Sequence, residues 1–324
     1  MKVVILDDYQ RAFERCPAIS RLRERAEVRL YTEKLAGEAL LDALAGAQAI
    51  VPIRERTKFP AALLNGLPAL ELIAQTGGHA YHIDVAAATA HGILIAFAPG
   101  GTGAAELTIG LMISVMRRIP QSDQALRNGG WPLVLGTVLR GKTLGILGLG
   151  KVGAEVSRIA AAFGMKVIAW GPTLTRERAE KAHVTFLPLE EVLRLSDVVS
   201  VHLKLSDLST GLLNEARLRL MRKSAYLVNT ARGAIVDEIA LVKILREGCI
   251  GGAALDVFVE EPLAPASPLL GLDSVVLTPH LGWPTDAGFE GFADNATEII
   301  LNYMDGKMPR AHNPEALERR SRYR

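Results

Sequence analysis

Short apolar runs alternate with helical patterns along the first part of the chain. The runs with the length of strands are residues 3–6, 27–31, 49–53, 70–75 and 93–97. Two helical patterns between them cover residues 37–46 and 84–92. Strands that alternate with helices form βαβ units around a parallel sheet. We therefore predict a doubly wound α/β domain over residues 1–99.

The same alternation restarts after a helical pattern over residues 104–119 and a break at 127–132. The further predicted strands are residues 143–150, 166–170, 198–202, 225–230, 252–257 and 274–280. They predict a second doubly wound parallel sheet, in a domain over residues 100–283. One more helical run, residues 292–304, follows Pro284. Because a single helix is not stable alone, we assign residues 284–324 to the first domain, which becomes discontinuous.

The composition excludes several classes of protein. Lys plus Arg total 37 and Asp plus Glu total 35 among 324 residues, so no nucleic-acid-binding surface is expected. We interpret the basic segment 318–324 as a solvated tail. No stretch offers the roughly 18 apolar residues of a membrane span, and the first ten residues resemble a buried strand more than a signal peptide. The two cysteines, Cys16 and Cys249, form no metal or redox motif and suit a cytoplasmic protein.

The sequence GLGKVG has the spacing of a dinucleotide-binding loop. It follows an apolar strand and begins an amphipathic helix, which is the context that makes this spacing specific. Gly148 permits the tight turn, Gly150 lets the backbone approach the pyrophosphate, and Gly153 allows close packing of helix on strand. Free N–H groups at the start of the helix face the phosphates. We expect the cofactor to contact Gly148, Leu149, Gly150, Lys151, Val152 and Gly153.

The position that usually selects NAD lacks a carboxylate. An Asp or Glu about 20 residues after the first glycine holds the ribose 2′-OH of NAD, but the next strand is followed by Gly171. A 2′-phosphate would meet no charge repulsion there. Thr173 and Thr175 could donate hydrogen bonds to it, and Arg176 or Arg178 could supply positive charge. Alternatively, these residues form the capped first turns of a surface helix, with both arginines solvated. The sequence favours NADP slightly over NAD.

Three polar residues lie where predicted strands of the second domain end: Arg232, Glu261 and His280. The carboxyl ends of the strands in an open parallel sheet line the ligand crevice. A guanidinium binds a carboxylate through two hydrogen bonds, and an imidazole transfers protons near neutral pH. A neighbouring carboxylate favours the imidazolium. Each residue alone could be structural, but all three beside a dinucleotide loop favour an active site.

The chain resembles the D-isomer-specific 2-hydroxyacid dehydrogenases over nearly its whole length. The matching segments are IDVAAATAHGI (83–93), AELTIGLM (105–112), GKTLGILGLGKVG (141–153), VNTARGAIVDEIAL (228–241), GGAALDVFVEEPL (251–263) and LTPHLG (277–282). The resemblance implies two similar α/β domains, a discontinuous substrate domain and a central cofactor domain. It also implies a homodimer joined through the cofactor domain.

The resemblance further implies roles for single residues. Arg232 would bind the α-carboxylate of the substrate and help polarise its keto oxygen, and Glu261 would support the histidine. His280 would donate a proton during reduction and accept one during oxidation. Asp256 matches the residue that binds the nicotinamide carboxamide, with a strand-end cap as the alternative. Thr230 joins the expected cofactor contacts.

The loop over residues 76–84 is similar to the family's loop whose backbone N–H groups hold the substrate carboxylate. Gly77, Gly78 and His79 are therefore candidates for substrate binding. The family usually has a glycine where His79 stands and a small amide where His82 stands. We interpret His82 as a surface histidine, with a more crowded and polar pocket mouth as the alternative.

These features predict NAD(P)-dependent, reversible reduction of a small 2-keto acid, such as glyoxylate or hydroxypyruvate, to a D-2-hydroxy acid. A dinucleotide-sensing binding protein on the same fold is the alternative, although the intact set of Arg232, Glu261 and His280 argues against it. A dehydrogenase for formate or phosphite is a third interpretation, for which we find no substrate-specific motif. No metal, nucleic acid or membrane is expected to bind.

Overall fold

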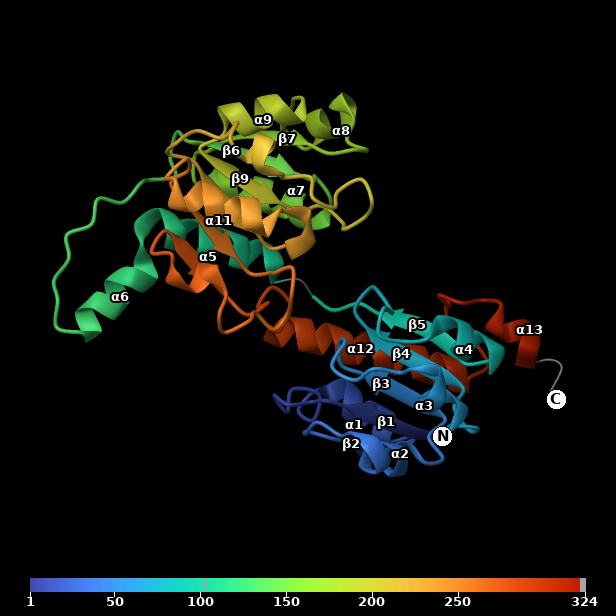
Figure 1. Ribbon diagram of the computed structural model, residues 1–324. Helices are drawn as coiled ribbons and strands as arrows, with labels where there is room; N and C mark the ends of the chain where they lie inside the picture. The colour runs from blue at the N-terminus through green and yellow to red at the C-terminus, as the bar shows by residue number, and fades with distance from the viewer. Residues whose placement is uncertain (102, 321–324) are drawn as a thin grey trace. The chain divides into compact units, whose positions relative to one another are not determined.

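The computed structural model describes residues 1–101 and 103–320, and the chain forms two compact units. Unit 1 contains Met1–Gly101 and Pro284–Arg324, and unit 2 contains Thr102–Trp283. Each unit holds one parallel β-sheet with helices packed against it (Figure 1). The fold class predicted from the sequence, two parallel-sheet α/β domains of which one is discontinuous, is confirmed.

Unit 1 is built on a parallel sheet in the order β2-β1-β3-β4-β5. Its strands are β1 (Lys2–Leu6), β2 (Glu27–Leu30), β3 (Ala49–Pro52), β4 (Leu72–Thr76) and β5 (Leu94–Ala98). Its helices are α1 (Pro17–Arg23), α2 (Gly37–Leu44), α3 (Ala61–Asn65), α4 (Val85–Ala90), α12 (Asp286–Met304) and α13 (Ala316–Arg320). Strands β3 and β4 are buried along their whole length, as the continuous apolar runs predict. The strand order reverses between β1 and β3, where folds of this order bind ligands.

Helix α12 begins earlier than its hydrophobic pattern predicts, at residue 286 instead of 292. The Thr285 side chain caps the helix by accepting a hydrogen bond from the Gly288 N–H, at 3.0 Å. Gly288 and Gly291 weaken the local helical pattern, since glycine is a poor helix former. A Cβ at Gly291 would lie 2.8 Å from the backbone nitrogen of Gly101. These glycines therefore serve close packing within unit 1, and the sequence pattern alone does not show it.

Unit 2 contains a parallel sheet in the order β12-β11-β10-β9-β6-β7-β8. Its strands are β6 (Thr143–Leu147), β7 (Lys166–Trp170), β8 (Thr185–Phe186), β9 (Val198–Val201), β10 (Tyr226–Asn229), β11 (Gly252–Leu255) and β12 (Val275–Leu277). Its helices are α5 (Ala104–Arg117), α6 (Ile119–Arg127), α7 (Lys151–Ala162), α8 (Arg176–Lys181), α9 (Leu189–Leu195), α10 (Glu215–Leu218), α11 (Glu238–Arg246) and the 3₁₀ turns η1 (Gly233–Ile235) and η2 (Pro268–Gly271). The order reverses between β6 and β9, which is the dinucleotide-binding order extended by β12.

The sequence pattern missed helix α6. Helix α5 ends where Arg118 adopts a left-handed φ of 53°, and α6 follows at once. No residue of α6 is buried, and its apolar residues are too few to mark a helix in the sequence. We call residues 119–138 the arm; Figure 1 shows α6 and the segment after it standing away from the sheet of unit 2.

Three further properties of the described part of the chain bear on function. Over residues 1–101 and 103–320, no group of three or more His, Cys, Asp or Glu side chains is placed to hold a metal ion. In the same ranges, none of the helices combines the length and the apolar character that crossing a membrane requires. Both thiols, Cys16 and Cys249, are free cysteines.

Candidate active site

The loop between β6 and α7 has the geometry that a dinucleotide needs. Gly148 has a φ of 102°, and a Cβ there would lie 2.7 Å from the carbonyl oxygen of His202. A Cβ at Gly153 would overlap the carbonyl oxygen of Gly148, whereas a Cβ at Gly150 meets no atom within 4 Å. Between these glycines lie Leu149, in the loop, and Lys151 and Val152, in the first turn of α7. The chain is closely packed at Gly148 and Gly153 and open at Gly150. This arrangement fits a pyrophosphate at the N-terminus of α7.

Gly171 lies directly beside this loop. It follows the last residue of β7, Trp170, whose carbonyl oxygen accepts a hydrogen bond from the Gly148 N–H at 2.7 Å. A Cβ at Gly171 would lie 3.4 Å from the Leu174 Cβ and 3.7 Å from the Gly148 Cα. Those are ordinary van der Waals distances. The position therefore has room for the side chain that it lacks.

The segment after Gly171 forms the surface helix that the sequence offered as an alternative. Thr175 caps α8 by accepting a hydrogen bond from the Arg178 N–H, at 3.2 Å. Arg178 also turns its guanidinium back, and its Nη1 donates to the Thr173 carbonyl at 3.0 Å. Arg176, Arg178 and Thr173 are exposed. The helix is confirmed, and it carries one arginine against the turn that follows β7.

A histidine–glutamate contact forms the centre of the polar cluster in unit 2. The His280 Nδ1 lies 2.7 Å from the Glu261 Oε2, and the Glu261 Oε1 accepts a hydrogen bond from the Phe258 N–H at 2.9 Å. Burial raises the pKa of the Glu261 carboxyl, but the hydrogen bonds from His280 and Phe258 and the charges of His280 and Arg232 outweigh burial and lower it. Glu261 is therefore ionised at neutral pH. Its contact with Nδ1 directs the other ring nitrogen, Nε2, toward proton exchange.

Local sequence explains why Arg232 lies near this pair. Asn229 closes the corner after β10, because its Nδ2 donates to the Arg232 carbonyl at 3.0 Å. A Cβ on the next residue, Gly233, would overlap the backbone of Phe258. Only glycine lets the chain that leads to Glu261 pack against this corner. The order Asn-Thr-Ala-Arg-Gly thus places the guanidinium close enough to lower the pKa of Glu261.

Asp256 shapes the loop that carries the histidine. It is fully buried, and its Oδ1 accepts from the Thr278 hydroxyl at 2.5 Å and from the Leu281 N–H at 2.7 Å. Its Oδ2 accepts from the Gly282 N–H at 2.9 Å. These bonds draw the chain out of β12 earlier than the apolar run predicts and hold His280 at a left-handed φ of 56°. The structure thus gives Asp256 the capping role; its contact with a nicotinamide stays a prediction.

The predicted catalytic residues of unit 2 therefore gather beyond the carboxyl ends of β10, β11 and β12. Thr230 lies one corner away, and its hydroxyl pairs at 2.8 Å with that of Thr108 in α5. That contact ties α5 to the corner that holds Arg232. A guanidinium, an ionised carboxylate and an imidazole with one nitrogen left for exchange can bind an anion and move one proton.

Unit 1 contains a second polar cluster, around the predicted substrate loop. Gly77 has a φ of 100°, and a Cβ there would overlap the Arg54 guanidinium. The Arg54 N–H donates to the Thr76 Oγ1 at 2.7 Å, which joins the ends of β3 and β4. Sequence reasoning missed Arg54. The rule that found Arg232 would also have found it, since Arg54 follows directly the apolar run at 49–53.

Glu55 joins Arg54 to His79. Its Oε1 lies 3.1 Å from the Arg54 Nη2 and also pairs with the His79 Nε2. The His79 ring stacks on Tyr81, with ring centroids 4.6 Å apart and an interplanar angle of 19°. Burial raises the pKa of the Glu55 carboxyl, but the His79 hydrogen bond and the charges of Arg54 and His79 outweigh burial and lower it to about 2. Glu55 is therefore a permanent negative charge in this loop.

The interpretation of His82 as a surface histidine is wrong. Its ring is half-buried, its Nε2 lies 3.0 Å from the Gln75 Oε1, and it meets Phe59 edge to face at 6.3 Å. Burial lowers the pKa of His82 to about 4. The charge of Glu55 acts in the opposite direction, and the charges of His79 and Arg54 lower the pKa further. His82 is a neutral residue that packs against Gln75 and Phe59. The signal in the sequence was the apolar residue that follows it, Ile83, which is buried.

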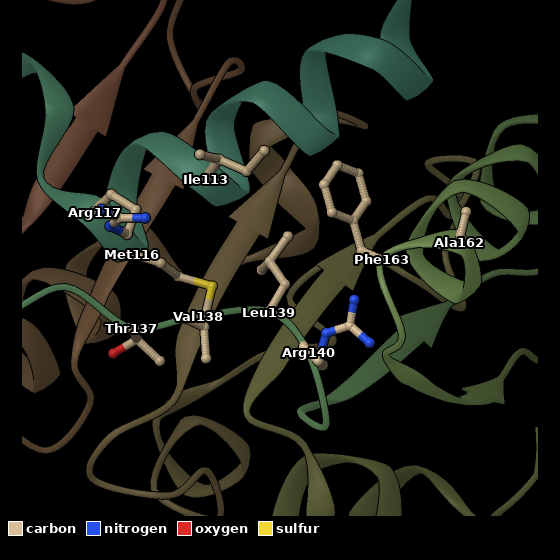
Figure 2. A pocket seen from close by; sticks show the side chains of 9 residues that line it. All are labelled: Ile113, Met116, Arg117, Thr137, Val138, Leu139, Arg140, Ala162 and Phe163. Atoms are coloured by element: carbon tan, nitrogen blue, oxygen red, sulfur yellow. The ribbon is translucent and has the colours of Figure 1, made fainter.

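Unit 2 also has a cavity of about 330 Å³ away from the residues described above (Figure 2). Figure 2 shows α5 on one side and the end of the arm on another. Its lining residues are Ile113, Met116, Arg117, Thr137, Val138, Leu139, Arg140, Ala162 and Phe163. None of them is a predicted site residue, and the lining is mostly apolar.

Comparison with known proteins identifies the family. A family model for the D-isomer specific 2-hydroxyacid dehydrogenase, NAD binding domain, matches residues 109–282. The glyoxylate reductase of Aeropyrum pernix is 43% identical over 258 residues, which are 76% of this chain and 77% of that protein. The D-3-phosphoglycerate dehydrogenase of Archaeoglobus fulgidus is 38% identical over 294 residues, 89% of this chain but 55% of that protein.

A solved structure, of a putative D-3-phosphoglycerate dehydrogenase oxidoreductase from Ralstonia solanacearum, superposes with a TM-score of 0.88 at 36% identity and covers 98% of each chain. Sequence and fold thus agree over almost the whole length. The chain belongs to the D-isomer-specific 2-hydroxyacid dehydrogenase family.

Proposed function

We propose that this enzyme reversibly reduces a small 2-keto acid to the D-2-hydroxy acid, with NAD(P) as the redox cofactor. The observation that carries the proposal is the contact between His280 and Glu261 at 2.7 Å, near Arg232, in a unit whose glycine loop fits a dinucleotide. The bound nicotinamide would supply or accept the hydride. Relatives named for glyoxylate and for D-3-phosphoglycerate support a 2-hydroxy acid as the substrate class.

Each residue of the cluster has a chemical task in this reaction. Arg232 binds the α-carboxylate of the substrate through two N–H groups. His280 gives a proton from Nε2 to the keto oxygen during reduction and takes it back from the hydroxyl during oxidation. Glu261 keeps the other ring nitrogen protonated and stabilises the imidazolium. In unit 1, the backbone N–H groups of the loop that includes Gly77 and His79 bind the substrate carboxylate.

A turnover assay tests this proposal. Purified enzyme is mixed with glyoxylate, hydroxypyruvate, pyruvate and 2-ketobutyrate, each with NADH and with NADPH, and the loss of cofactor absorbance is followed. We expect reduction of at least one keto acid, with the D-hydroxy acid found by chiral chromatography. Saturable cofactor binding without turnover of any keto acid would support the alternative of a dinucleotide-sensing protein.

We also propose that NADPH is preferred over NADH. Gly171 stands beside the glycine loop where a carboxylate would contact the ribose, and it supplies none. The exposed Thr173 and the guanidinium of Arg178 lie at the same turn. Arginine near this position is a common partner of the 2′-phosphate.

A homodimer through the cofactor domain completes the proposal. The arm exposes Trp131, Leu133 and Leu135 to 83%, 93% and 100%. Apolar side chains exposed so fully in one segment mark an interaction site, and the resemblance points to a second copy as the partner. We place the enzyme in the cytoplasm, because its free thiols suit a reducing compartment.

A further inference from the structure

An arginine that is already paired with a glutamate lies at the carboxyl ends of β3 and β4. The strand order reverses between β1 and β3, so ligands of unit 1 are expected at the carboxyl ends of these strands. Arg54 and Glu55 follow β3, and Gly77 follows β4. The Arg54 side chain is only 11% exposed and lies against Gly77. Arg54 therefore lies beside the loop that is proposed to hold the substrate, whereas the other arginine after β3, Arg56, donates to the Asp7 carbonyl and lies over the Tyr9 ring.

Glu55 limits what the Arg54 guanidinium can bind. Its carboxylate contacts the Arg54 guanidinium at 3.1 Å and the His79 imidazole as well. The negative charge thus compensates the arginine before any ligand arrives. A second anion near Arg54 would have to displace Glu55 or lie beside it, and like charges at close range are unfavourable. Glu55 itself is 37% exposed, so its charge faces the solvent side of the loop.

We propose that Glu55 determines the charge selectivity of the substrate site, admitting 2-keto acids with an uncharged side chain and rejecting those that carry a second anionic group. The proposal rests on the proposed function, in which the loop of Gly77, Gly78 and His79 holds the substrate carboxylate. The α-carboxylate is common to every 2-keto acid and uses backbone N–H groups. A phosphate ester or a second carboxylate at this loop would compete with Glu55 for the side chain of Arg54.

A matched pair of substrates tests the proposal: hydroxypyruvate and 3-phosphohydroxypyruvate differ only in the phosphate. We measure kcat/KM for both in the wild-type enzyme, Glu55→Gln, Glu55→Asp and the control Glu27→Gln, an exposed glutamate of β2 that pairs with Arg29. The wild-type enzyme should prefer hydroxypyruvate by at least tenfold. Glu55→Gln should shift the ratio toward the phosphorylated substrate by at least tenfold, mainly through KM, while Glu55→Asp and Glu27→Gln keep the wild-type preference.

Two outcomes overturn the proposal: a wild-type enzyme that prefers the phosphorylated substrate, or a Glu55→Gln enzyme whose ratio is unchanged, including equal losses on both substrates. If Glu55→Gln does not fold, Glu55→Ser replaces it. Calorimetric titration with D-glycerate and 3-phospho-D-glycerate measures the same preference without turnover. Failure of the proposed function would look different. The enzyme would then turn over none of the keto acids, whatever its relative affinity for D-glycerate and 3-phospho-D-glycerate.

Discussion

Two carboxylates near His280 have different tasks because their surroundings differ. Asp256 is fully buried, and the three donors that bind it all come from residues 278–282. It holds the loop in shape. Glu261 accepts a hydrogen bond from one backbone N–H and contacts the histidine ring. Its negative charge therefore acts directly on the protonation of the ring. At the scale of single residues, this difference supports the proposed proton-transfer role of Glu261 and His280, while Asp256 holds the loop that carries the histidine.

His280→Ala should lower kcat for keto-acid reduction by about 100- to 10,000-fold, which is the usual contribution of general acid–base catalysis. The affinity for NADPH should stay within about twofold, because the glycine loop is untouched. Steady-state kinetics and fluorescence titration of NADPH measure the two effects. His91→Ala is the control, since His91 is an exposed histidine of unit 1 that pairs with Asn65. Turnover close to wild type in the His280 variant would contradict the assignment.

Glu261→Gln should be milder than the loss of the histidine. It keeps a hydrogen bond to the ring but removes the charge that favours the imidazolium. Reduction needs the protonated ring, so its rate should begin to decline at a lower pH than in the wild-type enzyme. A profile of kcat/KM against pH measures this; an unshifted profile would mean that Glu261 does not govern the proton.

Two half-buried histidines should make stability depend on pH. Burial lowers the pKa of His202 and of His82 to about 4, from an ordinary value of 6.5. Between these values the unfolded chain binds more protons than the folded chain, so stability falls as pH falls. Each histidine should contribute about 2 kcal/mol of loss between about pH 7 and pH 5. Urea unfolding should show a smaller loss in His202→Gln than in wild type, and the same loss in His91→Gln.

At the scale of elements, the turn between β7 and α8 combines two roles. Thr175 caps the helix, and Arg178 returns from its first turn to the Thr173 carbonyl. The cap uses the Arg178 backbone N–H, whereas the proposed phosphate contact would use the Arg178 guanidinium. Gly171 leaves this turn without a negative charge, and its neighbours leave room for a side chain.

Gly171→Asp should therefore move cofactor preference toward NADH. The new carboxylate would bind the ribose 2′-OH and repel a 2′-phosphate. We expect the ratio of kcat/KM for NADH over NADPH to rise at least tenfold, or about 1.4 kcal/mol. Thr185→Asp, at an exposed position of β8, is the charge-matched control. A wild-type enzyme that already favours NADH tenfold would show that another feature selects the cofactor.

At the scale of the whole molecule, the arm is a segment that the rest of unit 2 covers poorly. Helix α6 buries no residue, and Leu133 and Leu135 are 93% and 100% exposed. The cavity of Figure 2 lies where the end of the arm meets α5 and α7. A second copy that covers the arm would remove this apolar surface from water.

The double variant Leu133→Lys/Leu135→Lys should shift the enzyme from dimer to monomer. Charges placed in an apolar interface lose their solvation without gaining partners. Light scattering coupled to size exclusion should give twice the mass of one chain for wild type and the single mass for the variant. Leu208→Lys is the control, since Leu208 is 73% exposed outside the arm. A wild-type enzyme that is monomeric at micromolar concentration would refute the dimer.

The sequence alone determined features that follow from local periodicity and strand ends. Continuous apolar runs marked the buried parallel strands, and the spacing of Gly148, Gly150 and Gly153 marked the cofactor loop. The rule that polar residues past strand ends meet at one edge selected Arg232, Glu261 and His280, and the structure brings these three near one another. Such inferences succeed because they depend on residues close in sequence and on the regular geometry of a parallel sheet.

Only the tertiary structure decided features that depend on contacts between distant segments. Arg54 and Glu55 became site candidates because Gly77, at the end of another strand, leaves space for the guanidinium. His82 became a neutral packing residue because Gln75 and Phe59 surround it. The first turns of helix α12 contain glycines because they pack against the backbone near Gly101, and this weakens the sequence pattern there. Burial and close packing depend on contacts with segments that are distant in sequence, so a local pattern does not encode them.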